Sequence, residues 1–103
     1  MLSFNLNVQP QTAKRLKKVL EFTGNEEAFA QNIIAYQIAE IRRAILNLRL
    51  DLKTFEEKYK MSSADFYEKY SGGRMDDSED FILWAGMCEM LEKNETRLRG
   101  LEG

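Results

Sequence analysis

The sequence predicts a mainly α protein that forms an intertwined homodimer through one N-terminal strand per chain. Three observations lead to this fold class: residues 2–8 alternate between apolar and polar, the chain after Pro10 follows helical spacing, and a heptad-type apolar series runs through its centre. We expect a dimerisation and binding head over residues 1–45 and a helical extension over residues 46–103. A long second helix would run from the head into the extension.

The composition favours a binding protein over an enzyme. The chain has 103 residues, 44% of them hydrophobic, which suits one small domain with an appendage. It has no histidine and a single cysteine, Cys88, which excludes imidazole bases, histidine metal ligands and an intrachain disulfide. No apolar run reaches the ~18–20 residues that span a membrane, and no signal-peptide pattern opens the chain. We therefore expect a cytoplasmic protein that is not an enzyme and needs no cofactor.

The N-terminal segment has the alternation of a β-strand. Side chains of period two place one apolar and one polar side along an extended backbone. No second strand follows in the sequence, so the backbone groups of this strand would stay unpaired within one chain. Pairing with the same strand of a second copy would satisfy them, which predicts a twofold homodimer. The apolar side would hold Leu2, Phe4, Leu6 and Val8, and the polar side Ser3, Asn5 and Asn7.

The next two elements are predicted to be helices. Pro10 fits the first turn of a helix over about residues 10–22, and Gly24 suits the residue after its last turn. Asn25 is a good N-cap for the following helix. The first helix places four cations largely off its apolar face: Lys14, Arg15, Lys17 and Lys18.

A long second helix is expected over residues 26–60. Neither glycine nor proline interrupts this stretch, and at 1.5 Å per residue it would be about 52 Å long. Its apolar residues follow the 4, 3, 4, 3 spacing that is typical of a coiled coil. This series comprises Ile34, Ile38, Ile41, Ile45, Leu48, Leu52, Phe55 and Tyr59.

Two further helices are expected in the extension. Ser62 or Ser63 can cap a short helix that runs through Tyr70, and a glycine pair at 72–73 would end it. A last helix would begin in the acidic stretch at 76–80. Its expected apolar face holds Phe81, Trp84, Met87 or Cys88, Leu91, Leu98 and Leu101.

Charge is divided unevenly along the chain. Residues 1–24 hold four cations and one carboxylate, whereas residues 61–103 hold five cations and ten carboxylates. A basic head and an acidic tail can engage different partners, although such clustering also arises by chance in a short chain.

The paired strands would suit duplex DNA. A two-stranded ribbon fits the major groove, which is about 12 Å wide, and asparagine can bond both N6 and N7 of adenine. Ser3, Asn5 and Asn7 are the candidate base-reading residues. Asn25, at a helix N-terminus, is a candidate phosphate contact, although two glutamates follow it. The alternative is a ribbon that serves dimerisation only. Further phosphate contacts would come from Lys14, Arg15, Lys17 and Lys18.

Residues 2–45 resemble the ribbon-helix-helix family of repressors in their strand, Pro10-initiated helix, Gly24–Asn25 turn and isoleucine-rich second helix. The resemblance implies an intertwined dimer that reads DNA with its paired strands and sets the start of its second helix against phosphates. The sequence departs from the family in one respect, because the reading positions hold serine and asparagine with no arginine or lysine.

The extension is similar to the tails of antitoxins, which join a DNA-binding head to a segment that neutralises a toxin protein. Aromatic residues are frequent at binding surfaces, but most of these are expected to fill a core against the long helix. The resemblance implies a toxin as a possible protein partner. The candidate partner-binding residues are Phe66, Tyr67, Tyr70, Phe81 and Trp84.

Two other features have ordinary explanations. The carboxylates at 76, 77, 79 and 80 lack the spacing of a calcium loop and suit a helix start, so we expect no metal site. Cys88 lies among apolar residues and is expected to be a small buried side chain. The sequence thus predicts a dimeric DNA-binding transcriptional repressor of the antitoxin type. The alternative is a helical or coiled-coil dimer that acts as a scaffold without binding DNA.

Overall fold

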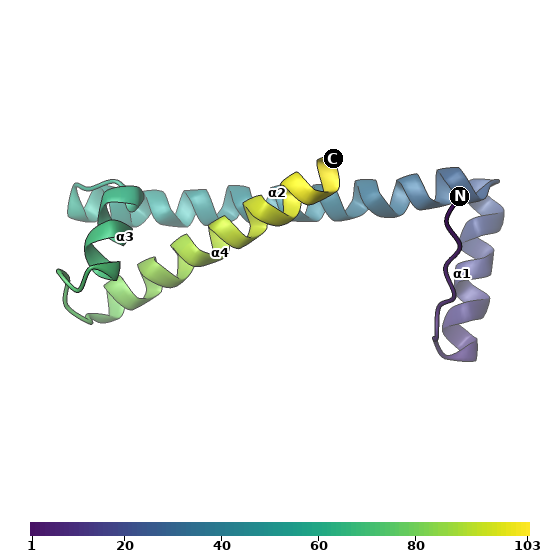
Figure 1. Cartoon of the computed structure of the whole chain (residues 1–103), viewed down its shortest axis with the longest axis horizontal. Coiled ribbons are helices and arrows are strands. Elements are labelled where there is room, and N and C mark those ends of the chain that lie inside the picture. The colour runs from purple at the N-terminus through teal and green to yellow at the C-terminus, as the bar shows by residue number, and fades with distance from the viewer. The chain divides into compact units, whose positions relative to one another are not determined.

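The computed structural model describes all 103 residues and contains four α-helices and no strand (Figure 1). Helix α1 spans Pro10–Thr23, α2 spans Glu26–Tyr59, α3 spans Ser63–Ser71 and α4 spans Glu79–Glu102. The chain is 79% helical, so the mainly α class is confirmed. Contacts divide the chain into two compact units, Met1–Tyr36 and Gln37–Gly103, whereas the sequence suggested a boundary after residue 45.

The predicted N-terminal strand is wrong. Residues 1–9 have no regular secondary structure, which also overturns the ribbon-helix-helix fold and the resemblance to that family. The alternation of residues 2–8 indicates only which side chains would lie on the same side of an extended segment. A strand needs in addition a hydrogen-bonding neighbour, and no other segment of the chain is a strand. Asparagine at positions 5 and 7 is also a poor strand former.

Helices α1 and α2 begin where the sequence predicts and end within one residue of the predicted positions. Pro10 occupies the first turn of α1, and Gly24 follows its last turn with a φ of 94°, while its N–H donates to the carbonyl of Leu20 at 3.0 Å. Asn25 caps α2, because its Oδ1 accepts the N–H of Ala28 at 2.7 Å. With 34 residues, α2 is about 51 Å long at 1.5 Å per residue.

The core of the unit Gln37–Gly103 is an aromatic stack to which three helices contribute. Phe66 of α3 lies flat on Trp84 of α4, with ring centroids 3.9 Å apart and planes 2° from parallel, and both side chains are fully buried. Phe55 of α2 stacks on Trp84 at 5.6 Å. Leu52 and Ala85 complete the buried cluster. The stack therefore fixes how α2, α3 and α4 pack within this unit.

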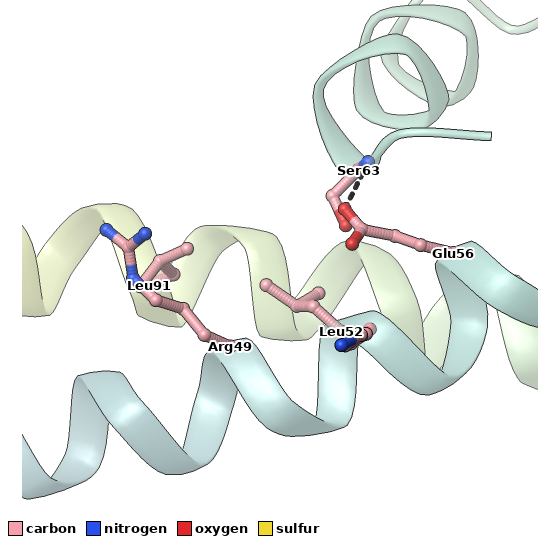
Figure 2. Close-up of a pocket in the computed structure, with 6 residues that line it drawn as sticks. Arg49, Leu52, Glu56, Ser63 and Leu91 are labelled. Carbon is pink, nitrogen blue, oxygen red and sulfur yellow. Dashed lines mark hydrogen bonds between the residues drawn. The ribbon is translucent and has the colours of Figure 1, made fainter.

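Two hydrogen bonds at the start of α3 hold the stack in place. The indole N–H of Trp84 donates to Oγ of Ser63 at 2.9 Å. The N–H of Ser63 donates in turn to Oε2 of Glu56 at 2.9 Å, as the dashed line in Figure 2 marks. Because a buried indole N–H without an acceptor is costly, Ser63 allows tryptophan to occupy the centre of the core. Every buried side-chain nitrogen and oxygen of the chain has a partner.

Polar pairs between α2 and α4 surround this core. Asp80 accepts hydrogen bonds from Nζ of Lys58, at 2.7 Å, and from the hydroxyl of Tyr59. These donors lower the pKa of the Asp80 carboxyl, and the same hydrogen bonds raise the pKa of Lys58 and of Tyr59. Farther along the two helices, ion pairs join Arg49 to Glu95 at 3.3 Å and Arg42 to Glu102. Exposed pairs of this kind contribute at most about 1 kcal/mol each, so they align the helices more than they stabilise them.

Removing one ring of the stack should destabilise the unit severely. We expect Phe66→Ala to lower the free energy of unfolding by about 3–5 kcal/mol, because the cavity would lie at the centre of a small core. Leu46→Ala, at a side chain of α2 that is 58% exposed, is the matched control and should cost far less. Urea unfolding followed by circular dichroism measures both; equal effects would contradict the central role of the stack.

The hydrogen bonds to Asp80 should make the stability of the folded chain depend on pH. The pKa of Asp80 is lower in the folded chain than in the unfolded chain, so its contribution is complete above the ordinary aspartate pKa of about 3.9 and is lost as the pH falls through the folded value. We therefore expect Asp80→Asn to lower the melting temperature at pH 7 and to narrow its gap to the wild type as the pH falls below 4. Thermal melts from pH 7 to pH 2 test this expectation; a constant gap would contradict it.

Candidate functional site

The unit Met1–Tyr36 has no core of its own. None of its side chains is buried, and all of residues 1–10 are exposed. Phe4 is 78% exposed and Phe22 is 85% exposed, although large apolar side chains gain about 1.5–3 kcal/mol from full burial. This unit therefore presents to the outside the side chains that would normally form an interior.

An apolar groove of about 630 Å³ runs between the N-terminal segment and the start of α2. Ser3 and Glu26 are the only polar residues of its lining. A lining of this composition suits apolar side chains, and no hydrogen bond joins its serine to its carboxylate. The main apolar lining residues are Leu2, Phe4, Leu6, Leu20, Phe29 and Ile33.

The four cations predicted to contact phosphates lie exposed on α1. None of them forms an ion pair within the chain, and Glu21 is the only carboxylate on this helix. Their charges are therefore available to an anionic partner such as a nucleic-acid backbone. These residues are Lys14, Arg15, Lys17 and Lys18.

The predicted base-reading residues are exposed but do not form a ribbon. Ser3, Asn5 and Asn7 lie in the irregular N-terminal segment, and Ser3 lines the groove. Asn25, the fourth polar candidate, uses its side chain to cap α2. Glutamates 26 and 27 in the first turn place negative charge at this helix start, so it is a poor phosphate site.

The predicted partner-binding aromatic residues build the core of the second unit. Phe66 and Trp84 are fully buried. Tyr67, Tyr70 and Phe81 are half-buried and pack against them. The hydroxyl of Tyr67 donates to Glu89 at 2.8 Å, which raises the pKa of that tyrosine. Of the two interpretations that the sequence left open for these residues, the structure favours the core.

The helical spacing of apolar residues did not predict which large apolar side chains are exposed in place of these aromatic residues. On α2 these are Leu46 and Leu50, both 58% exposed, and on α4 they are Ile82, Leu83 and Met90, between 50% and 54% exposed. The spacing of Ile82, Leu83 and Met90 around Gly86 is the signal that could have identified the exposed residues of α4. A hydropathy pattern misses it because the glycine in the middle has no apolar side chain.

No group of histidine, cysteine, aspartate or glutamate side chains is placed to hold a metal ion. Cys88 is half-buried, and burial together with two nearby glutamates raises the pKa of its thiol, so the unreactive protonated form is favoured.

A shallow cleft of about 330 Å³ lies between α2, Ser63 and Leu91 (Figure 2). Its polar side chains already have partners. Arg49 pairs with Glu95, and the carboxylate of Glu56 accepts the N–H of Ser63. Lys53 alone is left at the rim, which is too little to define a ligand site.

The comparisons with known proteins identify no relative: no family profile matches the chain, and neither a curated protein nor a solved structure shows detectable similarity to it. None of the four helices combines the length and the apolar character that a membrane crossing requires.

Proposed function

We propose that this chain is a non-enzymatic interaction protein that self-associates through residues 1–36. The observation that carries the proposal is the absence of any buried side chain in this unit. Below about 40 residues a unit needs a disulfide, a metal or oligomerisation to become stable. The only cysteine, Cys88, lies in the other unit, and no metal-binding cluster exists. Association with another chain would supply the interior that this unit lacks.

The exposed apolar side chains of this unit support a second copy as that other chain. Phe4, Leu6 and Phe22 are 78%, 67% and 85% exposed. When two copies meet, the apolar groove of one can bury the exposed apolar side chains of the other.

Such a dimer would act as a helical scaffold. Each subunit brings its own folded module of residues 37–103, whose core does not depend on residues 1–36. The dimer would therefore present two copies of that module to further partners. The groove is lined mainly by apolar side chains, and in the smaller cleft Arg49 and Glu56 are engaged with Glu95 and Ser63, which supports a non-enzymatic role.

A second candidate is a dimeric DNA-binding transcriptional regulator of the antitoxin type, which would also bind a toxin protein. One observation favours it: α1 carries four exposed cations without intrachain partners. A dimer would double that number, and phosphate contacts alone can supply much of the affinity for DNA. In this candidate, sequence would be read by Ser3, Asn5 and Asn7 as exposed side chains of the N-terminal segment.

Self-association is tested at the groove. We expect light scattering to show at least two chains per particle for the wild type, and Ile33→Glu to reduce that mass, because a charge would enter an apolar contact. Asn32→Glu, at the neighbouring exposed position, is the matched control and should leave the mass unchanged. A wild-type monomer at micromolar concentration would overturn the proposal.

DNA binding is tested separately, by fluorescence anisotropy with the duplex upstream of this protein's own gene. If α1 contacts phosphates, the log of the affinity should fall linearly with the log of the salt concentration, by about 0.9 for each phosphate neutralised. Lys14→Gln together with Lys17→Gln should weaken binding and flatten this slope. Lys53→Gln, at an exposed lysine of the other unit, is the control. Absence of binding at low salt would leave the scaffold as the function.

A further inference from the structure

Helix α4 has a second apolar face that stays exposed within the unit Gln37–Gly103. One face carries Trp84 and Ala85 into the core. Ile82, Leu83 and Met90 point away from it and are 53%, 50% and 54% exposed. Because positions three, four and seven apart lie on the same side of a helix, these three residues form one stripe, with position 86 in the middle.

Position 86 holds a glycine for which the chain itself gives no reason. A Cβ atom at Gly86 would meet nothing within 4 Å, and the residue lies inside a regular α-helix of 24 residues. Glycine inside a helix is less favourable than alanine by about 0.5–1 kcal/mol. A glycine is useful at such a place when another backbone approaches closely.

Charged residues flank this stripe symmetrically. Glu79 lies seven residues before Gly86 and Lys93 lies seven residues after it, so both share its side of the helix. Both are exposed, and neither forms an ion pair within the chain. The face thus has an acidic end, a mainly apolar centre and a basic end. Glu89 borders the centre, where its carboxylate accepts the hydroxyl of Tyr67.

We propose that α4 pairs antiparallel with α4 of a second copy of this chain, with Gly86 at the twofold axis. In this arrangement Glu79 faces Lys93 of the second copy, and Ile82 faces Met90 of the second copy. Each contact occurs twice, as an isologous interface requires. The missing side chain at Gly86 lets the two helices approach closely where they cross.

The charge pattern selects this occupant and this direction. A parallel pairing would set like charges against one another at both ends, which is unfavourable. A partner helix of a single charge sign would be repelled at one end of the face. A second copy in antiparallel orientation complements both ends and the apolar centre at once.

This interface does not depend on the association proposed for residues 1–36. The two surfaces lie on different units, and the module of residues 37–103 has its own core. If both surfaces are used, assemblies of more than two chains form. If only the α4 face is used, the full chain carrying Ile33→Glu still forms dimers.

Charge reversal tests the interface in the full chain carrying Ile33→Glu. In this background, association through residues 1–36 does not contribute. In sedimentation experiments we expect Glu79→Lys alone, or Lys93→Glu alone, to raise the dissociation constant about tenfold, because each change replaces two attractions by two repulsions. The double variant Glu79→Lys/Lys93→Glu should restore association, since the swapped charges again face opposite ones. Glu92→Lys, an exposed position off this face, is the control.

Glu79→Lys lies at the first residue of α4 and could weaken association simply by destabilising the start of that helix. The double variant carries the same substitution, so its recovery would exclude this explanation. Single variants that associate like the parent, or a double variant as weak as the singles, would overturn the proposal. A monomeric Ile33→Glu chain that shows no association at any concentration would also overturn it. Self-association through residues 1–36 would stand in each of these cases.

A cross-link tests the position of the axis. In a full chain carrying Cys88→Ala, the substitution Gly86→Cys places two thiols next to each other across the twofold axis, within the 4.4–6.8 Å Cα separation that a disulfide needs. We expect oxidised glutathione to link two chains through this residue much faster than through Glu92→Cys in the same background. Equal rates at the two positions would overturn the proposed axis.

Discussion

The stacking of Phe66 on Trp84 is the interaction on which the rest of this molecule depends. A chain of this length has enough apolar residues for one well-packed core, and the stack places that core between α2, α3 and α4. Leu52, Phe55 and Tyr59 of α2 converge on the same two rings. Residues 1–36 are left without an interior of their own, which is why we propose that they associate with another chain.

The stack in turn depends on polar support at one point. Tryptophan can lie at the centre of a core only if its N–H finds an acceptor, and Ser63 provides it. The same serine donates its backbone N–H to Glu56, so the start of α3 is held between α2 and α4 (Figure 2). The aromatic contacts determine how the helices pack. The salt bridges farther along α2 and α4 are exposed and only help to align these two helices.

The sequence was most informative where local chemistry decides the structure. Pro10, Gly24 and Asn25 set the limits of α1 and α2, and uninterrupted heptad spacing predicted the long helix; all of these are confirmed. It misled where a partner decides the structure. The alternation over residues 2–8 has no hydrogen-bonding neighbour in this chain, so no strand forms.

The aromatic residues of the extension could have been core or surface, because periodicity shows that a face is apolar and not what covers it. The structure resolves this for Phe66 and Trp84, which are buried. It also shows the uncovered stripe on α4, whose central residue, Gly86, has no side chain to register in a hydropathy pattern. The groove of residues 1–36 escaped prediction for a related reason, since it joins segments that are distant in the sequence.

The position of the single tryptophan gives this protein a built-in spectroscopic separation of its two units. Trp84 is the only indole in the chain, and it is fully buried in a stack that belongs wholly to residues 37–103. Its emission spectrum therefore reports the hydration of that core alone, whereas far-ultraviolet ellipticity sums the helices of both units. Comparing the two signals during one titration distinguishes melting of α1 from loss of the aromatic core without any label.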